Sequence, residues 1–284
     1  MTESSKGTLY VVATPIGNLD DLSPRAAKVL AGVALIAAED TRHTSRLLRH
    51  LGLDRPMLSL HEHNEERRVD QLGARLDAGD DVALVSDAGT PLICDPGFVL
   101  VRALRERGAR IVPIPGPCAL VAGLSAAGLP TDRFLFVGFL PSRSGPRCAR
   151  LEELGERDET LVFYESPHRI RDTLADIAAS FFDRRVVLAR ELTKTFETFL
   201  DGSASGLLAR MDDDPDQARG EFVVMVAGAP PRENESSAVD GLALLGALLD
   251  EGVGVKQAAG VATKLLGGRK KSWYAQALSL KDDG

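Results

Sequence analysis

Several loops of this chain carry glycine, proline and a small polar residue directly after a short apolar run. The clearest is "SDAGTP" at 86–91, which follows the unbroken apolar run 82–85. Such a run predicts a buried strand, and open α/β sheets hold their ligands at the carboxyl ends of strands. The loop contains one acid, Asp87, and no lysine, so it does not match the phosphate-binding GxxxxGK[ST] motif. Its composition indicates a ligand that is recognised through backbone groups and shape.

Three further loops have the same character, namely "TPIGN" at 14–18, "AEDTRHT" at 38–44 and "PIPGPCA" at 113–119. If the strands before them are parallel, all four loops meet at one edge of a sheet and form a concave site with few charges. A dinucleotide would call for GxGxxG after the first strand, where the chain has only Gly17. S-adenosylmethionine fits better, because its sulfonium needs a dry pocket and its ribose and amino group need an acceptor such as Asp87.

The residues that we expect to bind this cofactor lie in these loops and in the small-residue segment 125–127. They are Pro15, Ile16, Gly17, Asp87, Ala88, Gly89, Gly116, Ser125 and Ala126. Each also has a purely structural interpretation: Asp87 as an Asx-turn, Gly89 and Gly116 as turn glycines, and Ser125 as part of a helix face packed on the sheet.

The elements that must position these loops alternate between strand and helix patterns, which is typical of an α/β fold with a mainly parallel sheet. We expect a first α/β domain at 1–117 and a second at 118–229 that completes the cofactor cleft. A polar Pro/Ser-rich linker at 230–240 precedes a small helical, helix-turn-helix-like region at 241–284. Ser23 and Pro24 predict the start of the first helix, as N-cap and first-turn proline.

Composition narrows the class of protein further. Hydrophobic residues make up 44% and charged residues 26% of the 284 residues, which predicts a well-packed globular chain. The net charge of -7 argues against a protein that coats nucleic acid non-specifically, although it allows a local basic patch. The three cysteines form no CxxC pair, so we expect a reducing, cytoplasmic setting without a disulfide framework. No signal peptide and no apolar run of membrane-spanning length is apparent.

Six segments in order, "TPIGNL", "AEDTRHT", "SDAGTP", "PGPCA", "FYESPHR" and "ARELTK", resemble the tetrapyrrole methylase superfamily, in its branch that methylates RNA of the small ribosomal subunit. The resemblance covers about 9–228, and the helical tail is similar as well. It implies two α/β domains with S-adenosylmethionine between them, a homodimer, and 2′-O-methylation of a cytidine at the decoding site of 16S rRNA. Relatives methylate porphyrin precursors or make diphthine, so the fold alone does not fix the substrate. "TPIGN", in place of a more glycine-rich first loop, favours the RNA branch.

Transfer of a methyl group to a hydroxyl is faster when a base removes the hydroxyl proton. Glu165 is the first candidate for that base, and Glu39 or Asp40 the second. Lys194 is expected to steady the sugar-phosphate. The alternatives are a helix start around Glu165 and a surface ion pair for Lys194.

Basic residues close to these loops are candidates for contacts to RNA. They are Arg42, His43, His168, Arg169, Arg143, Arg147, Lys270 and Lys271. Arg143 and Arg147 lie in what reads as a Gly/Pro/Ser loop over 142–150. The last two lie in a tail segment, 256–274, that has five basic residues and no acid. His61 and His63 have no obvious third partner, so we expect no metal site.

Two other functions stay open at this point. A methyltransferase that acts on a tetrapyrrole precursor would need a small anionic macrocycle and no RNA. A ribosome assembly factor that only responds to S-adenosylmethionine would bind the cofactor without turnover. The basic tail favours RNA over the macrocycle, and the cofactor loops favour an enzyme over a pure binding protein.

Overall fold

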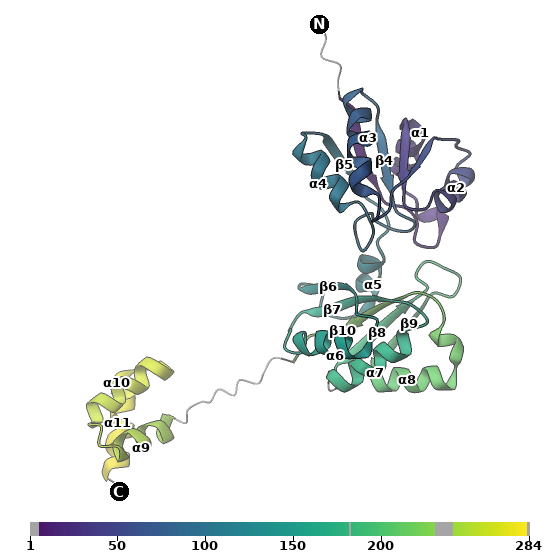
Figure 1. Cartoon of the computed structure of the whole chain (residues 1–284). Helices are drawn as coiled ribbons and strands as arrows, with labels where there is room; N and C mark the ends of the chain where they lie inside the picture. Colours follow the sequence, from purple (N-terminus) through teal and green to yellow (C-terminus); the bar gives the residue numbers. More distant parts are fainter. Residues whose placement is uncertain (1–5, 182, 231–240, 283–284) are drawn as a thin grey trace. The chain divides into compact units, whose positions relative to one another are not determined.

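The computed structural model describes residues 6–181, 183–230 and 241–282 of the chain. The chain divides into two compact units, Met1–Gly228 and Ala229–Gly284. The first unit contains two five-stranded sheets, and the second is helical (Figure 1). The predicted linker at 230–240 lies outside the described residues from 231 onward. None of the described helices is long and apolar enough to cross a membrane.

The first sheet is parallel throughout, as the alternation of strands and helices predicts. Its strands, in spatial order, are β3 (Met57–Ser59), β2 (Leu35–Ala38), β4 (Val82–Val85), β1 (Thr8–Val12) and β5 (Arg110–Ile114). The connections leave the central pair β1 and β4 in opposite directions, so the sheet has its topological switch point there. Ligands of open α/β sheets bind beside the carboxyl ends of the strands at such a point.

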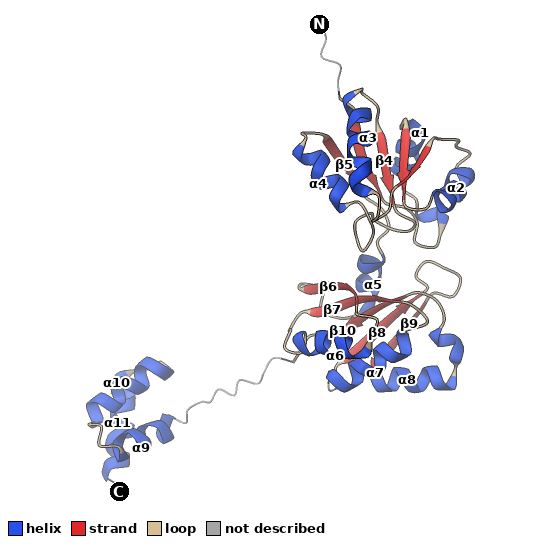
Figure 2. Ribbon diagram, viewed as in Figure 1, coloured by secondary structure: helices blue, strands red, loops and turns tan. Residues whose placement is uncertain are grey.

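Helices cover both faces of this sheet, which explains why β2 and β4 are buried and continuously apolar (Figure 2). The helices α1 (Pro24–Gly32) and α2 (Thr41–His50) pack on one face. The helices α3 (Glu65–Asp77) and α4 (Phe98–Glu106) pack on the other. The predicted start of α1 is confirmed, since the Ser23 hydroxyl accepts a hydrogen bond from the N–H of Ala26 at 3.0 Å.

The second sheet is mixed. Its strands, in spatial order, are β6 (Phe134–Phe139), β7 (Thr160–Glu165), β10 (Phe222–Val226), β8 (Arg185–Arg190) and β9 (Thr198–Ser203). The pair β6–β7 is parallel, and the other pairs are antiparallel. One face is covered by α5 (Ala119–Ala127), and the other by α6 (Ser144–Glu153), α7 (Ile170–Ser180) and α8 (Ala204–Asp213). The predicted domain boundary at 118 falls between β5 and α5, and it stays a prediction.

Two elements of the second sheet domain differ from the sequence-based expectations. The edge strand β9 carries Asp201 and Gly202, which strands disfavour, and it was not expected. The expected loop over 142–150 is wrong, because most of it belongs to α6. Gly145 and Pro146 lie in the first turn of α6, where proline is tolerated, and Leu151 packs into the core.

Over its described residues 241–282, the second unit contains three helices, as predicted: α9 (Gly241–Asp250), α10 (Val255–Leu266) and α11 (Lys270–Asp282). They pack around a small cluster formed by Leu245, Ala258, Ala262 and Ala277. Small alanine side chains at these positions allow the helices to approach closely.

Candidate active site

A cavity of about 280 Å³ lies between the carboxyl ends of the first sheet and the second sheet. This volume is close to the lower end of the range for small-molecule sites. Its walls come from the loops after β1 and β4, the start of α5, and β7, β8 and β10. The lining residues are Ile16, Ala88, Gly89, Thr90, Ile93, Cys94, Asp95, Cys118, Ala119, Phe139, Tyr164, Glu165, Ser166, Ala189, Leu192, Lys194, Glu221, Phe222 and Val223.

The loops after β1 and β4 are joined backbone to backbone. Thr14 and Gly89 exchange two hydrogen bonds, with N···O distances of 2.8 and 3.0 Å. Gly89 has a φ of 82°, and a Cβ at this position would lie 3.3 Å from Cγ2 of Ile16. The hydroxyl of Thr90 donates to the carbonyl of Pro117 at 3.0 Å, which ties in the loop before α5. Three of the four predicted loops therefore meet at this point.

A strained turn after β8 forms the opposite wall. Glu191 and Thr193 both have positive φ, at 52° and 66°, although neither is glycine. Glu191 folds back over Gly220, where a Cβ would come within 2.3 Å of its Cγ. Strain of this kind persists only where surrounding contacts enforce it, and it is frequent at functional sites. Here it aims the side chain of Lys194 at the cavity.

Lys194 is held between two carboxylates. Its Nζ lies 2.8 Å from Oε1 of Glu191 and 2.9 Å from Oε2 of Glu221. Burial lowers the pKa of Lys194, but the hydrogen bonds to Glu191 and Glu221 outweigh it, so the pKa is raised. Lys194 is therefore a cation at neutral pH. It can hold an anionic group, and it is unsuited to act as a base.

Gly17 allows the first loop to lie directly against this turn. A Cβ on Gly17 would be 2.4 Å from Cγ of Lys194 and 3.1 Å from the carbonyl oxygen of Leu192. The N–H of Asn18 donates to the hydroxyl of Thr193 at 3.1 Å. The loop after β1 and the turn after β8 are thus in contact at Gly17, which does not itself line the cavity.

A group of carboxylates lies at the carboxyl ends of β2 and β4. The N–H of Asp40 donates to Asp87 at 3.0 Å, and the N–H of Asp87 donates to Glu39 at 3.3 Å. Asp95, in the loop after β4, interacts electrostatically with Glu39 and Asp87. Of these four carboxylates, Asp95 is the one that lines the cavity. Burial, opposed by a hydrogen bond from Ser86, and repulsion from Glu39 and Asp87 raise the pKa of Asp95 to about 6. Burial also raises the pKa of Glu39.

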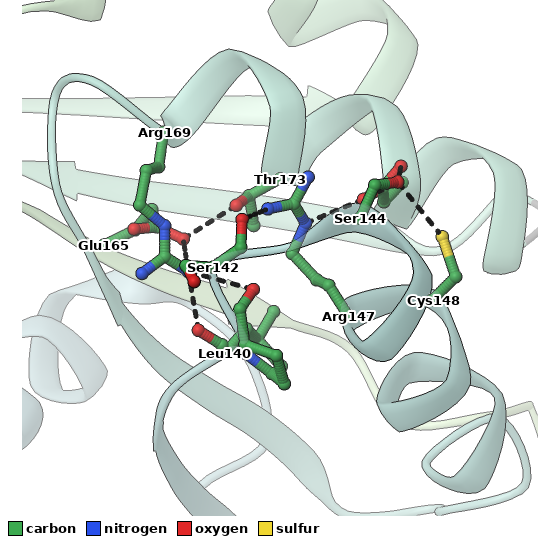
Figure 3. A network of polar contacts seen from close by, with 10 residues as sticks. Leu140, Ser142, Ser144, Arg147, Cys148, Glu165, Arg169 and Thr173 are labelled. Carbon is green, nitrogen blue, oxygen red and sulfur yellow. Dashed lines mark hydrogen bonds and ion pairs between the residues drawn. The ribbon is translucent and has the colours of Figure 1, made fainter.

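Glu165, the first candidate base, has polar partners at both carboxylate oxygens (Figure 3). Oε1 accepts from the N–H of Ser166 at 2.8 Å. Oε2 accepts from the hydroxyl of Thr173 at 2.7 Å and lies 3.2 Å from Nη2 of Arg169. The Glu165 side chain is buried, and Arg169 in turn donates to the carbonyl of Leu140 at 2.6 Å. These contacts fix the end of β7 against the start of α7.

Five of the predicted site residues line the cavity: Ile16, Ala88, Gly89, Glu165 and Lys194. The other predicted cofactor residues lie outside its lining, and two of them, Ser125 and Ala126, are exposed on α5. Their role as a cofactor wall stays a prediction, and α5 turns its opposite side, with Leu120, Gly123, Leu124 and Ala127, toward the second sheet. Glu39 and Asp40 do not line the cavity, but both are hydrogen-bonded to Asp87, whose chain neighbour Ala88 does.

The predicted RNA contacts are dispersed. Arg42 pairs with Asp40 at 2.7 Å, and the Arg42 guanidinium holds the pKa of that carboxyl well below its usual range. His43, Arg143 and His168 are exposed. Lys270 and Lys271 are exposed on α11 of the second unit.

Arg147 requires a correction, because the structure places it inside the second sheet domain. Its side chain is 3% exposed, and its Nε lies 2.7 Å from Oδ2 of Asp176 on α7. Nη1 donates to the carbonyl of Ser142 at 3.1 Å. Figure 3 shows the Arg147 side chain extending from its helix toward Ser142. The assumption of a loop led to the error, since α6 turns every fourth residue toward the core.

Sequence reasoning missed several residues of the cavity, of which Asp95 and Tyr164 are the most informative. Asp95 lies in the same loop as Gly89, but it comes after the glycine and proline on which the interpretation concentrated. The Tyr164 hydroxyl accepts from the N–H of Leu120 at 3.1 Å, and its ring packs edge-on against Phe136 and Phe139. Burial raises the pKa of Tyr164. Its place directly after the apolar run 161–163 in β7 was the available signal.

Within the described residues, no group of three or more His, Cys, Asp or Glu side chains is arranged to hold a metal ion. The rings of His61 and His63 lie 6.0 Å apart. The site therefore consists of backbone groups, apolar walls and a few charged side chains.

Comparisons with known proteins define the class. The family model of tetrapyrrole (corrin/porphyrin) methylases matches residues 8–208. The solved structure of uroporphyrin-III-C-methyltransferase from Thermus thermophilus aligns with a TM-score of 0.56 at 20% identity, over 78% of this chain and 94% of that one. Diphthine synthase aligns with a TM-score of 0.60 at 15% identity, over 78% and 90%. The chain belongs to the tetrapyrrole methylase family, and the predicted fold is confirmed.

Relatives that match nearly the full length of this chain indicate its branch within the family. "Ribosomal RNA small subunit methyltransferase I" of Pseudomonas aeruginosa is 53% identical, over 96% of this chain and 98% of the relative. The protein of the same name from Escherichia coli O157:H7 is 50% identical, over 97% and 96%. A model described as the RsmI C-terminal HTH domain matches residues 235–281. Within its family, the chain therefore groups with the ribosomal RNA small subunit methyltransferase I proteins, as the sequence motifs predicted.

Proposed function

We propose that this chain transfers the methyl group of S-adenosylmethionine to ribosomal RNA of the small subunit, at the 2′-hydroxyl of a cytidine in the decoding site of 16S rRNA. The observation that carries the proposal is the 53% identity to a named small-subunit rRNA methyltransferase over 96% of the chain. At this similarity the two chains share their fold.

The cavity suits such a cofactor. Ile16, Ile93, Leu192 and Val223 give it apolar walls, which an adenine ring and a sulfonium both favour. Gly89 and the backbone around it bring unhindered peptide groups to its edge. Among its lining residues Lys194 is the one cation, so the cavity lacks the several positive charges that a polyphosphate requires.

When bound, S-adenosylmethionine supplies a methyl group that is activated by a positively charged sulfur. The chain must align the ribose hydroxyl with that methyl, exclude water, and accept the hydroxyl proton as the new O–C bond forms and the C–S bond breaks. We assign proton acceptance to Asp95, which lines the cavity with a pKa of about 6. Glu39 and Asp40 are the alternatives at the same strand ends.

Glu165 then has a different task from the one that its position suggested. Because its oxygens already accept from Ser166, Thr173 and Arg169, it holds the end of β7 in place, and we rank it behind Asp95 as a base. Lys194, as a cation, steadies an anionic group of the cofactor or the sugar-phosphate.

We further propose a homodimer in the cytoplasm, and contacts of Lys270 and Lys271 with the RNA. These points rest on the sequence resemblance and on the exposed positions of both lysines. Light scattering of the purified chain checks the dimer. Crosslinking of α11 to small-subunit RNA checks the lysines.

The decisive experiment supplies labelled S-adenosylmethionine and small ribosomal subunits from cells that lack this protein. Protein-free 16S rRNA is run in parallel, and the label is mapped by nuclease digestion and mass spectrometry. Label on one cytidine ribose supports the proposal, and the parallel arm shows whether an assembled subunit is needed. Label on neither RNA, with turnover on a tetrapyrrole precursor, would replace the RNA substrate by a macrocycle. Cofactor binding without any turnover would indicate an assembly factor.

A further inference from the structure

The outer surface of α2 is a basic stripe. Arg42, Arg46 and Arg49 follow one another at spacings of four and three, which places them on one side of a helix. The buried residues Thr44, Leu47 and Leu48 occupy the opposite side and pack toward the sheet. All three arginines are exposed, and the side chain of Arg42 is 89% exposed. The stripe therefore points away from the core.

The neighbouring helix α1 extends this surface. It packs on the same face of the first sheet as α2 (Figure 1). Its exposed residues include Arg25 and Lys28. Together the two helices contain five lysines and arginines and no aspartate or glutamate. We call the surface formed by Arg25, Lys28, Arg42, Arg46 and Arg49 the basic face. It stands out in a chain whose net charge is -7.

The opposite face of the same sheet provides an internal comparison. The helices α3 and α4 contain five basic and five acidic residues. Among those five basic residues the described part of the chain gives an ion-pair partner only to Arg75, namely Asp80, while Arg107, just after α4, pairs with Asp70. On the basic face only Arg42 has an ion-pair partner among the described residues, namely Asp40. The two layers therefore differ in their number of acidic residues. The layer of α3 and α4 is balanced in its number of charged residues, whereas α1 and α2 carry five positive charges and no acid.

The basic face also begins beside the candidate active site. The helix α2 starts at Thr41, directly after Glu39 and Asp40, whose backbone and side chain bond to Asp87 at the ends of β2 and β4. From Arg42 to Arg49 the stripe extends roughly 10 Å along the helix, at 1.5 Å per residue. A polyanion that enters the site at these strand ends can therefore continue along α2.

We propose that the basic face binds the sugar-phosphate backbone of the RNA substrate and holds the strand that leads into the cavity. This inference rests on the proposed function, because it assigns the RNA-binding surface for that reaction. Phosphates are the partner that this chemistry favours: arginine forks pair with them in a bidentate manner, and each contact releases counterions. Contacts to phosphates carry no sequence information, so other residues must select the target nucleotide.

The test compares two double variants of equal charge change. R46Q/R49Q removes two cations from the basic face. R67Q/R105Q removes two exposed cations from the balanced layer of α3 and α4. The readouts are equilibrium binding of small subunits and of protein-free 16S rRNA at several salt concentrations, KM and kcat for methylation, and calorimetric binding of S-adenosylmethionine.

We expect R46Q/R49Q to weaken RNA binding and raise KM about 10-fold or more, with cofactor affinity and kcat at saturation unchanged. The slope of log affinity against log salt should become shallower by about 1.4 to 1.8, as loss of two phosphate contacts predicts. R67Q/R105Q should behave as the unchanged chain. Equal effects of both variants, or an unchanged salt slope, would overturn the proposal.

The binding arm separates this inference from the proposed function. If the unchanged chain binds RNA but methylates none, the proposed function fails, while the effect of R46Q/R49Q on binding still tests the basic face. If R46Q/R49Q weakens binding to subunits and leaves binding to protein-free 16S rRNA intact, the partner of this face is a ribosomal protein, and the assignment to RNA phosphates is wrong.

Discussion

The carboxylate of Glu65 on α3 accepts a hydrogen bond from the N–H of Gly97, at 2.8 Å, although 32 residues separate the two. The same carboxylate accepts from Val99 and Leu100, in the first turn of α4, at 3.0 and 3.2 Å. Glu65 is 5% exposed. A buried charge is acceptable here because it satisfies three donors at the positive end of a helix dipole. These hydrogen bonds anchor the end of the loop that carries Gly89 and Asp95 to α3.

Glu65→Gln should therefore destabilise the chain and loosen the cofactor site together. The amide can accept from fewer of the three donors and turns its own NH₂ group toward another, which costs about 2–3 kcal/mol. Urea unfolding measures the stability, and calorimetry measures the affinity for S-adenosylmethionine. Glu66→Gln, at an exposed neighbouring position, is the control. If both variants unfold at the same urea concentration, the anchoring role is wrong.

Asp95→Asn should lower activity and raise stability. With a folded-state pKa of about 6, Asp95 is ionised at pH 7 in a site that disfavours its charge. Between the unfolded pKa of about 4 and the folded value, the native state binds more protons, so this group contributes stability that is lost as pH rises. The neutral amide should therefore stabilise the fold at pH 7, on the order of 1 kcal/mol after allowance for solvent screening.

The pH profile of the same variant tests its role as a base. In the unchanged chain kcat/KM should rise with pH through an apparent pKa of about 6, because only ionised Asp95 accepts a proton. Asp95→Asn should lose this limb and about 100-fold or more in kcat, with cofactor binding retained. Glu106→Gln, at an exposed acid on α4, serves as the control. An unaltered profile in Asp95→Asn would move the base to Glu39 or Asp40.

Much of the fold could be predicted because its signals are local. The unbroken apolar run of β4 and the Ser23 cap of α1 each depend on a few adjacent residues. The roles of Glu165 and Arg147 could not be predicted in this way. Their partners Thr173 and Asp176 lie 8 and 29 residues away, and only the packed fold decides that these groups meet each other rather than a ligand. Charged side chains near a ligand loop look alike in sequence whether they bind substrate or hold the loop.

Gly17→Ala should impair the site although Gly17 does not itself line the cavity. The added Cβ would lie 2.4 Å from Cγ of Lys194 and close to the backbone at Leu192, so the first loop must move away from the turn after β8. We expect a loss of about 1–3 kcal/mol in stability, typical of overpacking, and weaker binding of S-adenosylmethionine. Gly145→Ala, where a Cβ meets nothing within 4 Å, is the control and should be neutral or stabilising. Equal cofactor affinity in both variants would show that the contact is dispensable.

Arg147 and Asp176 allow a structural role to be separated from an RNA contact. Their side chains are 3% and 17% exposed, so Arg147→Met leaves a carboxylate without its cation in a largely dry environment. Loss of one partner of a buried pair costs about 3–5 kcal/mol, whereas replacing both by apolar residues is often neutral. Arg147→Met should therefore lower the unfolding midpoint strongly, and R147M/D176L should recover most of the loss. Arg150→Met, at an exposed position on the same helix, should do little. If instead Arg147→Met keeps its stability and raises KM for small subunits, Arg147 contacts the substrate as the sequence had suggested. Recovery in the double variant, with KM unchanged, assigns the pair to the packing of α6 against α7.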